Sequence, residues 1–285
     1  MRLSRVLRVS AVVVAAGLAL AACGGGSSTS GSSGSTNVVS KAKNDKKLTI
    51  GIKFDQPGLG LKTADGKYVG FDVDVATYIA KQLGVDASGI TWKEAQSAQR
   101  EDLIKKGDVD FIVASYSITD ARKKVVSFAG PYFVAAQDLL VRQDNTDITG
   151  PESLTGNKKL CSVKGSTPAQ NIQKKYAQKV QLLERAKYTD CVTSLLSGEV
   201  DAMTTDNVIL AGYAAQYPGK LKLVGKGFTT ENYGVGFKLG DTETQTAINA
   251  AITKMESDGS WEASLKTNVG PSGFTIPAVP AITEK

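Results

Sequence analysis

The spacing of apolar residues predicts alternating strands and helices from Lys47 onward. Short apolar runs at 48–52 and 109–114, each bounded by polar residues, indicate strands. Between them, residues 71–83 carry apolar side chains at helical spacing, and Gly84 supplies a helix stop. This alternation predicts a mostly parallel sheet with helices on both of its faces.

The same pattern begins again after a polar, turn-rich segment at 143–156. The second half has predicted strands at 160–163, 180–183, 200–203 and 221–223, and predicted helices at 168–177, 189–196 and 207–216. One more strand at 233–237 precedes a helical region from 241 to about 266. Two successive α/β halves suggest two lobes, and clefts in open α/β sheets lie beyond the carboxyl ends of strands.

One junction between a predicted strand and a predicted helix carries candidate chemistry. Residues 115–122 read Ser-Tyr-Ser-Ile-Thr-Asp-Ala-Arg, with Thr119 as a good helix N-cap and Arg122 in the first turn behind it. Backbone N–H groups at a helix start attract anions, and an arginine beside them can hold a carboxylate through two parallel hydrogen bonds. The stretch is a candidate carboxylate clamp. The alternative is an ordinary junction with a solvated arginine.

Two further candidates lie in the second half. Residues 165–168, Gly-Ser-Thr-Pro, follow a predicted strand, where Thr167 can cap a helix and Pro168 suits its first position. The N–H groups there form a second candidate anion site. Asp206 also ends a predicted strand. Its carboxylate could pair with an ammonium group or simply cap the helix that starts at Asn207.

The first residues have the pattern of an export signal. Arg2, Arg5 and Arg8 form a basic segment. The apolar stretch at 11–22 is too short to span a bilayer as a helix. This combination predicts a signal peptide over residues 1–22 and an extracytoplasmic protein.

A lipid anchor is predicted at the end of this signal. Residues 20–23, Leu-Ala-Ala-Cys, resemble the lipobox of bacterial lipoproteins, in which the cysteine (here Cys23) carries the lipid. The alternative is cleavage at a small-residue site with an incidental cysteine. The Gly/Ser-rich stretch at 24–36 cannot bury apolar surface. Residues 23–46 are therefore predicted to be a lipidated cysteine followed by a flexible linker that tethers the domain to the outer face of the cytoplasmic membrane.

Composition excludes several classes of function. The net charge of +6 falls to +3 without the three signal-peptide arginines, and no long basic run exists, so nucleic-acid binding has little support. The sequence has no histidine, which excludes His-based triads and the usual zinc hydrolase sites; we expect neither a metal nor a cofactor. Cys161 and Cys191 form an even pair in an exported chain, which predicts a disulfide rather than two free thiols.

The order of four motifs identifies a family resemblance. Residues 68–74 (Tyr-Val-Gly-Phe-Asp-Val-Asp), 115–122, 165–167 and 200–206 resemble, in this order, the polar amino-acid-binding proteins of ABC importers, solute-binding protein family 3. The resemblance extends from about residue 48 to 266. It implies an α/β, two-lobed periplasmic-binding-protein-like (type II) fold with a central ligand cleft and two crossover segments.

The resemblance also implies where the lobes divide. We expect lobe 1 to comprise residues 47–138 and 233–285, and lobe 2 to comprise 139–232. The crossover segments would lie near 137–140 and 232–236, and the C-terminal helices would return to lobe 1.

The ligand residues are implied position by position. Arg122 matches the arginine that holds the ligand α-carboxylate, and Asp206 matches the aspartate that receives the α-ammonium group. Neighbouring positions implied at this end are Ser115, Ser117, Ser166 and Thr167. The side-chain pocket matches that of glutamate- and aspartate-binding members at Lys53, Ser97, Arg100 and, with a less sure alignment, Tyr188. The alternative for Lys53 and Arg100 is that both are surface charges.

These inferences predict a monomeric binding lipoprotein that delivers L-glutamate to an ABC permease. Two cations in the side-chain pocket would favour an acidic side chain over a neutral amide. The alternatives are a glutamine, aspartate or broad polar amino-acid binder, a dehydratase on the same fold, and a ligand sensor acting on a membrane receptor. Without histidine or an evident buried acid pair, we do not expect an enzyme.

Overall fold

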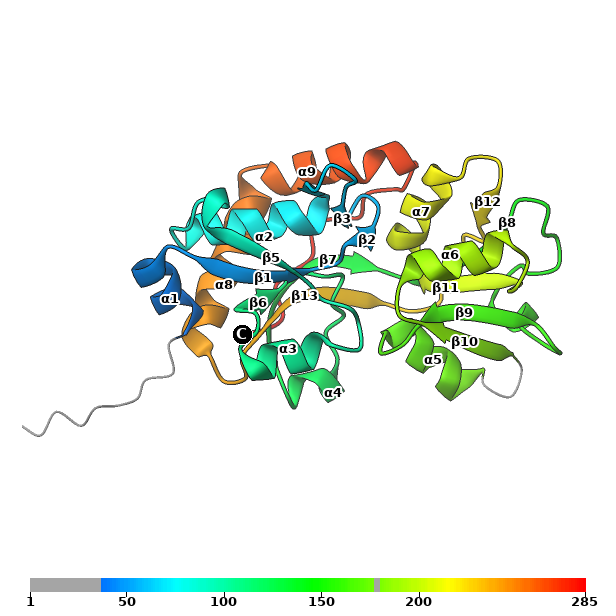
Figure 1. Cartoon of the computed structure of the whole chain (residues 1–285), viewed down its shortest axis with the longest axis horizontal. Coiled ribbons are helices and arrows are strands. Elements are labelled where there is room, and N and C mark those ends of the chain that lie inside the picture. The colour runs from blue at the N-terminus through cyan, green and yellow to red at the C-terminus, as the bar shows by residue number, and fades with distance from the viewer. Residues whose placement is uncertain (1–36, 177–179) are drawn as a thin grey trace, which may run out of the picture. The chain divides into compact units, whose positions relative to one another are not determined.

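Two five-stranded sheets, each with helices packed against it, form the framework of the protein (Figure 1). The structure is a computed structural model that describes residues 37–176 and 180–285. The predicted signal peptide and Cys23 lie outside the described residues. Within these ranges, no helix combines the length and the apolar character needed to cross a membrane.

The first sheet has the strand order β5-β1-β6-β13-β7. Its strands are β1 (Leu48–Ile52), β5 (Ile90–Glu94), β6 (Phe111–Ile112), β7 (Ser127–Ala135) and β13 (Glu231–Phe237). β1 is parallel to both of its neighbours, whereas β13 is antiparallel to β6 and β7. A small antiparallel sheet follows β1 in the chain and consists of β2 (Asp55–Gln56), β3 (Gly60–Lys62) and β4 (Tyr68–Val69).

The second sheet has the strand order β10-β9-β11-β8-β12. Its strands are β8 (Gln137–Arg142), β9 (Lys159–Val163), β10 (Gln181–Arg185), β11 (Ala202–Asp206) and β12 (Leu221–Leu223). β9 is parallel to β10 and β11, whereas β8 is antiparallel to β11 and β12. Both sheets are therefore mixed rather than mostly parallel as predicted. Consecutive strands run parallel in one sheet when a crossover helix connects them. No helix lies between β7 and β8 or between β12 and β13, where the chain passes from one sheet to the other, so these strands need not be parallel to their neighbours.

Helices cover the sheets and begin or end close to the predicted positions in most cases. They are α1 (Val38–Asp45), α2 (Phe71–Gln82), α3 (Arg100–Lys106), α4 (Asp120–Lys123), α5 (Thr167–Lys175), α6 (Tyr188–Leu196), α7 (Asn207–Gln216), α8 (Thr242–Ser257) and α9 (Ser260–Asn268), with 3₁₀ turns η1 (Ala87–Gly89), η2 (Pro151–Ser153) and η3 (Gly270–Ser272). α2 contacts both α8 and α9, so the C-terminal helices pack with the first sheet. They were predicted as one region, but Gly259, at a φ of 82°, separates them.

The chain crosses between the sheets twice. Only Ala136 separates β7 from β8, and residues 224–230 separate β12 from β13. Ala136 is bonded on both sides to Asn207, since its carbonyl accepts from the Asn207 N–H at 2.8 Å and its N–H donates to the Asn207 side chain at 3.2 Å. We call residues 37–135 and 231–285 the first lobe, and residues 137–230 the second lobe. The first crossing lies two or three residues, and the second two residues, earlier than the predicted boundaries.

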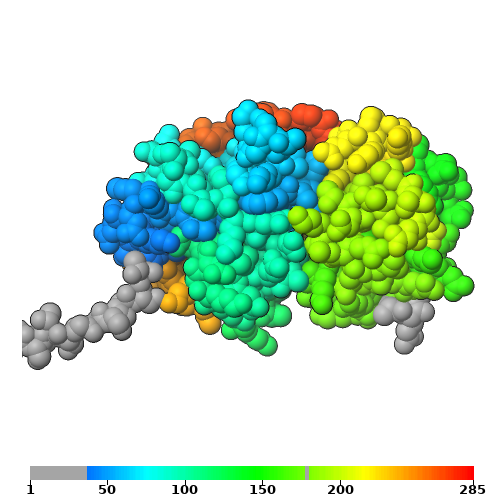
Figure 2. Space-filling model, viewed as in Figure 1, coloured from blue at the N-terminus to red at the C-terminus, as the bar shows by residue number. Residues whose placement is uncertain are grey.

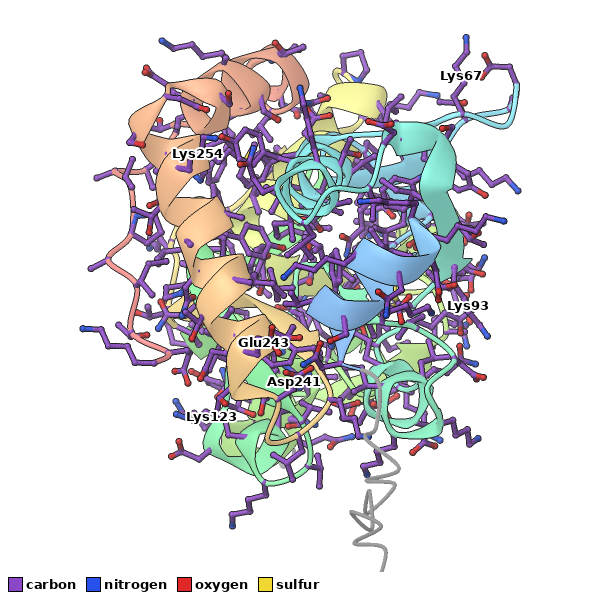
Figure 3. All side chains as sticks on the ribbon, turned by 90° about the vertical axis from the view of Figure 1, so that its left-hand side faces the viewer. Lys67, Lys93, Lys123, Asp241, Glu243 and Lys254 are labelled. Atoms are coloured by element: carbon purple, nitrogen blue, oxygen red, sulfur yellow. A yellow bond between two sulfur atoms is a disulfide. The ribbon has the colours of Figure 1, made fainter. Side chains whose placement is uncertain are left out.

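The prediction of a flexible linker up to residue 46 is wrong at its C-terminal end, where α1 forms. The Asn37 side chain caps this helix by accepting from the Ser40 N–H at 2.7 Å, and Val38, Val39 and Ala42 are buried. Asn37 also donates to Glu243 at 2.5 Å, which ties α1 to the start of α8 (Figure 3). The helix is short and polar, so packing rather than propensity stabilises it.

A disulfide joins Cys161 in β9 to Cys191 in α6, as predicted. Both sulfur-bearing residues are fully buried, and the bond closes a loop with a sequence separation of 30. It holds the helix that carries Tyr188 against the second sheet.

Replacing both bridging cysteines should lower the stability of the protein. In the chain-entropy model, a loop of this length stabilises a fold by about 3–4 kcal/mol. We expect Cys161→Ala with Cys191→Ala to lower the free energy of unfolding by about this amount, measured by urea denaturation followed by circular dichroism. Cys23→Ser is the matched control and should leave the midpoint unchanged. An unchanged midpoint in the double variant would contradict a stabilising role of the bond.

Candidate functional site

A buried carboxylate holds the turn after β6 in an unusual backbone conformation. Ser115 has a φ of 47°, in the left-handed region that residues other than glycine rarely adopt. Its N–H donates to Asp72 Oδ2 at 2.9 Å, and its hydroxyl lies 3.1 Å from the same oxygen. The Tyr132 hydroxyl donates to Asp72 Oδ1 at 2.7 Å. Asp72 therefore fixes the backbone from which the predicted carboxylate clamp begins.

Arg122 lies at the interface of the two lobes. Thr119 caps α4, as predicted, by accepting from the Arg122 N–H at 3.2 Å. The guanidinium donates from Nη1 to the Ser117 carbonyl at 2.7 Å, from Nη2 to the Gly165 carbonyl at 3.0 Å, and from Nε to Glu101 at 3.2 Å. Arg122 is only 6% exposed, so it is not the solvated arginine of the alternative interpretation. Its guanidinium has more N–H groups than these three bonds use, which leaves donors for a carboxylate.

The second predicted anion site has a different cap from the one expected. Ser166, and not Thr167, is the N-cap of α5, because its hydroxyl accepts from the Ala169 N–H at 3.1 Å. Thr167 is the first residue of the helix, and its hydroxyl is free to bond elsewhere. It lies 3.1 Å from the Ser117 hydroxyl and donates to Glu231 at 2.8 Å. This hydroxyl therefore links the second lobe to two segments of the first.

Asp206 presents a carboxylate with too little positive charge around it. It precedes α7, but its side chain makes no capping bond, so the capping alternative does not hold. The Tyr233 hydroxyl donates to Oδ2 at 2.5 Å, whereas Oδ1 is buried and has no partner among the described residues. Burial, together with the nearby charge of Glu231, raises the pKa of Asp206 to about 8. Such a carboxylate favours a cationic partner.

Two buried cations, Lys53 and Arg100, also lie close to the cleft. Lys53 donates from Nζ to the Ser97 hydroxyl at 2.8 Å and lies 5.8 Å from the centre of the Tyr188 ring. Burial, and then repulsion from Arg100, lower the pKa of Lys53 to about 7. Arg100 donates to the Ala114 carbonyl at 3.1 Å, but its Nε is buried without a partner in the described part of the chain. Neither residue is the surface charge of the alternative interpretation.

The structure brings the predicted ligand residues together. All except Thr167, which is partly exposed, are less than a tenth exposed, and direct bonds or charge interactions connect them across the two lobes. These residues are Lys53, Ser97, Arg100, Ser115, Ser117, Arg122, Ser166, Thr167, Tyr188 and Asp206. Charged groups of the cleft also act on one another, since Arg100 and Arg122 both lower the pKa of Asp206 from what burial alone would give.

Sequence reasoning missed several residues of this site: Asp55, Gln56, Glu101, Tyr116, Glu231 and Tyr233. Tyr116 lay within the motif but had no assigned role. Glu231 and Tyr233 stand at the second crossing, so the predicted crossover segment was the one signal that could have pointed to them. Asp55 lies beside Lys53, yet its partner is far away in the sequence.

Contacts on the β2 side of the site hold the lobes together. Asp55 Oδ2 accepts from the Tyr188 N–H at 2.8 Å, so a first-lobe carboxylate caps the N-terminus of α6 in the second lobe. The N-cap residue of α6 is Lys187, and its side chain makes no capping hydrogen bond. Lys187 instead pairs with Glu94 at 2.6 Å, and the Tyr213 hydroxyl donates to the Asp55 carbonyl. In Figure 2 the second-lobe surface abuts the first along this face.

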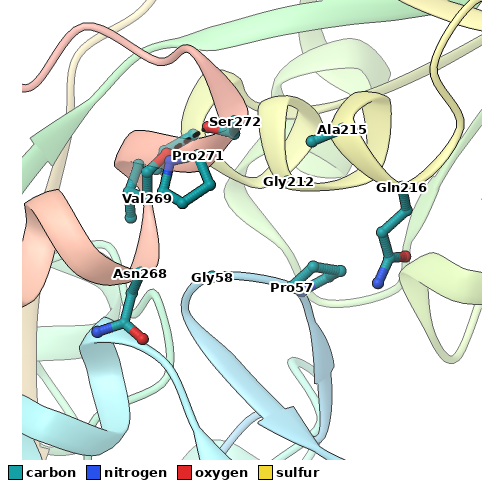
Figure 4. Close-up of a pocket in the computed structure, with 10 residues that line it drawn as sticks. Pro57, Gly58, Gly212, Ala215, Gln216, Asn268, Val269, Pro271 and Ser272 are labelled. Carbon is teal, nitrogen blue, oxygen red and sulfur yellow. Dashed lines mark hydrogen bonds between the residues drawn. The ribbon is translucent and has the colours of Figure 1, made fainter.

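Two hollows differ in their chemical character. One of about 490 Å³ adjoins the charged cluster and is lined in part by Ser97, Glu101 and Arg122. The other, of about 170 Å³, lies between α7 and the C-terminal segment and is lined by Pro57, Pro271 and other uncharged residues (Figure 4). Of these two, the first has charged side chains in its lining and the second has none. No cluster of side chains suited to a metal ion occurs in residues 37–176 and 180–285.

Comparison with known proteins gives consistent matches over most of the chain. The sequence model of the bacterial extracellular solute-binding proteins, family 3, matches residues 48–271. Glutamate-binding protein GluB of Corynebacterium efficiens is 44% identical over 96% of this chain and 93% of its own length. The ABC transporter glutamine-binding protein GlnH of Bacillus subtilis is 38% identical over 91% of this chain and 95% of its own.

Solved structures support the fold. An ancestral arginine-binding protein bound to glutamine has a TM-score of 0.74 and 34% sequence identity, over 79% of this chain and 98% of that chain. The predicted two-lobed type II fold is thereby confirmed. The matching family and the relatives named above are solute-binding proteins rather than enzymes.

Removing the charge of Asp55 should separate the lobes. A carboxylate at a helix N-terminus accepts hydrogen bonds and interacts favourably with the helix dipole, and this one does so only when the lobes touch. We expect Asp55→Asn to increase the radius of gyration, measured by small-angle X-ray scattering without added ligand.

The matched control is Asp65→Asn. Asp65 is an exposed acid of the first lobe that pairs with Lys67 in the turn after β3 and makes no contact with the second lobe in the bonds described here. It should leave the scattering unchanged. Equal radii for Asp55→Asn and the parent protein would show that this bond does not favour closure.

Proposed function

Because the chain belongs to the bacterial extracellular solute-binding proteins, family 3, we propose that it binds L-glutamate between its lobes and delivers it to an ABC permease. The α-carboxylate binds Arg122, with Ser117 and Thr167 as neighbouring donors. The α-ammonium group binds Asp206, whose free Oδ1 lacks a partner among the described residues. The same set of groups would serve any free amino acid, so the side-chain pocket decides the ligand.

The observation that carries glutamate is the buried pair Lys53 and Arg100, which has no matching acid in direct contact. Among the described ion pairs, neither residue has a carboxylate partner, and the Nε of Arg100 is unpartnered. Two buried cations in a low-dielectric pocket repel each other, and a γ-carboxylate supplies the missing negative charge. The name of the Corynebacterium relative supports the same ligand.

Glutamine is the second candidate, and the pKa of Lys53 favours it. At a pKa of about 7, a substantial share of Lys53 is neutral near neutral pH, and a neutral amine can pair with an amide. The glutamine-binding relative from Bacillus subtilis is consistent with this ligand. Arg100 keeps its charge, however, and an amide leaves that charge uncompensated, so glutamate is the better match.

Export and anchoring complete the proposal. Residues 1–22 act as the signal peptide, and Cys23 carries the lipid that holds the protein at the outer face of the cytoplasmic membrane. The protein works there as a monomer that presents its loaded, closed form to the permease.

Metabolic labelling with a palmitate analogue should mark the parent protein and not Cys23→Ser.

Neutralising both cations should weaken glutamate far more than glutamine. Hydrogen bonds to charged groups contribute about 1.5–3 kcal/mol each, so we expect Lys53→Met with Arg100→Met to reduce glutamate affinity about 100-fold or more. Glutamine, which does not need the second positive charge, should lose less than about tenfold. Titration calorimetry measures both ligands on the same preparation.

Lys62→Met is the control for loss of a lysine outside the cleft, because Lys62 is exposed on β3 over the rings of Phe54 and Tyr68. It should change neither affinity. A parent protein that binds neither amino acid would refute the proposed ligand, and equal losses for both ligands in the double variant would refute the side-chain assignment.

Glutamate affinity should have a maximum between about pH 7 and pH 8. Binding needs an ionised Asp206, whose pKa burial raises to about 8, and a charged Lys53, whose pKa burial lowers to about 7. Below this range a proton must leave Asp206 on binding, and above it Lys53 must take one up, so affinity falls on both sides.

Calorimetry in buffers of different ionisation enthalpy reports these protons directly. Net release is expected on the acidic side and net uptake on the alkaline side. Glutamine should show the acidic decline and not the alkaline one, because its amide does not require a charged Lys53. The same alkaline decline for both ligands would contradict the role given to Lys53.

A further inference from the structure

One aromatic ring contacts both guanidinium groups of the cleft. The guanidinium carbon of Arg100 lies 4.1 Å from the centre of the Tyr116 ring, and that of Arg122 lies 4.9 Å from the same centre. The ring is fully buried, and both arginines are nearly so. Cation–π attraction is strongest where water is excluded, so this ring interacts favourably with each cation.

The ring also separates two charges that repel each other. Burial, and then the charge of Arg100, lower the pKa of Arg122 to about 10. The negative face of an aromatic ring offsets part of this repulsion without adding an acid that would compete for the arginines. Glu101 forms a direct hydrogen bond with Arg122 Nε, and its charge also acts on Arg100. Tyr116 is the ring that both guanidinium groups contact directly.

Packing leaves the ring little freedom to move. Tyr116 meets Phe128 edge to face, with ring centres 4.8 Å apart. A Cβ atom at Gly236 would lie 2.6 Å from Cε1 of the ring, so glycine at this position leaves the space that the ring occupies. The neighbouring residues Ser115 and Ser117 are held by Asp72 and by bonds to the second lobe. The ring is thus a fixed surface against which two long, flexible side chains rest.

We propose that Tyr116 is a positioning residue that holds Arg100 and Arg122 at the separation at which one acidic amino acid binds both. This rests on the proposed function, because Arg122 receives the α-carboxylate and Arg100 the side-chain carboxylate. A ligand with two carboxylates needs both arginines in place, whereas glutamine depends mainly on Arg122. Loss of the ring therefore weakens glutamate more than glutamine.

The binding test compares Tyr116→Leu with Tyr116→Phe by titration calorimetry. Tyr116→Leu removes the ring, and we expect glutamate affinity to fall about tenfold or more and glutamine affinity clearly less. Tyr116→Phe keeps the ring and should stay within about threefold of the parent for both ligands. Phe237→Leu is the matched control, because it removes a buried ring of the first lobe for which no ring or guanidinium contact is found in the described residues. It should lower the melting temperature and leave the ratio of the two affinities unchanged.

A second measurement does not depend on any ligand. Protons that lie over an aromatic ring are shifted upfield, so the Nε–Hε signals of Arg100 and Arg122 should be displaced in the nitrogen–proton spectrum of the parent protein. Arg100→Lys and Arg122→Lys assign the two signals. The displacement should persist in Tyr116→Phe, disappear in Tyr116→Leu and persist in Phe237→Leu.

The outcomes separate the two proposals. Undisplaced arginine signals in the parent protein, or equal losses of glutamate and glutamine in Tyr116→Leu, would overturn the role of Tyr116. If the parent protein bound neither amino acid, the proposed function would fail, and the arginine signals would still decide whether Tyr116 positions the two guanidinium groups.

Discussion

Buried charge without a matching counter-charge is the constraint on which the cleft depends. Lys53 and Arg100 place positive charge on one side of the cleft, and Asp206 places negative charge on another. The shifted pKa values of Lys53 and Asp206, and the unpartnered Arg100 Nε and Asp206 Oδ1 among the described residues, indicate that these charges are not fully balanced. Burying an unpaired charge costs several kcal/mol, and the group shifts its pKa toward neutrality as a result. In the proposed function, a zwitterion with an acidic side chain would supply the opposite sign at each point. Such a ligand could drive closure of the lobes only by the free energy with which it prefers the closed form.

Each lobe contributes only a part of this charge pattern. Lys53, Arg100 and Arg122 belong to the first lobe. The turn of this lobe at Ser115 is fixed by hydrogen bonds to the carboxylate of Asp72. The second lobe contributes Asp206, together with the hydroxyl groups at the start of α5 and the ring of Tyr188. Because the two sheets are separate folding frameworks joined by short crossings, closure can assemble these groups without deforming either core.

The sequence was most informative where a residue stands at the end of a regular element. Arg122 and Asp206 follow predicted strands, but their side-chain partners Glu101 and Tyr233 were not predicted. It was least informative for long-range contacts, such as the bond from Asp55 to Tyr188, which joins residues 133 positions apart. It placed the cap of α5 at Thr167 instead of Ser166, because both residue types are good caps and predicted helix boundaries are uncertain by a residue or two. α1 was missed because packing against α8, rather than a periodic apolar pattern, stabilises it.

Ala136, the residue that alone separates β7 from β8, is held on both sides by Asn207. Asn207 is the covalent neighbour of Asp206, so the acid in the cleft is attached almost directly to the pivot about which the second lobe would rotate. Asp206 would therefore lie close to the axis of rotation, and the outer end of the second lobe would lie far from it. A displacement of Asp206 too small to disturb its strand would sweep that outer end through a much larger arc.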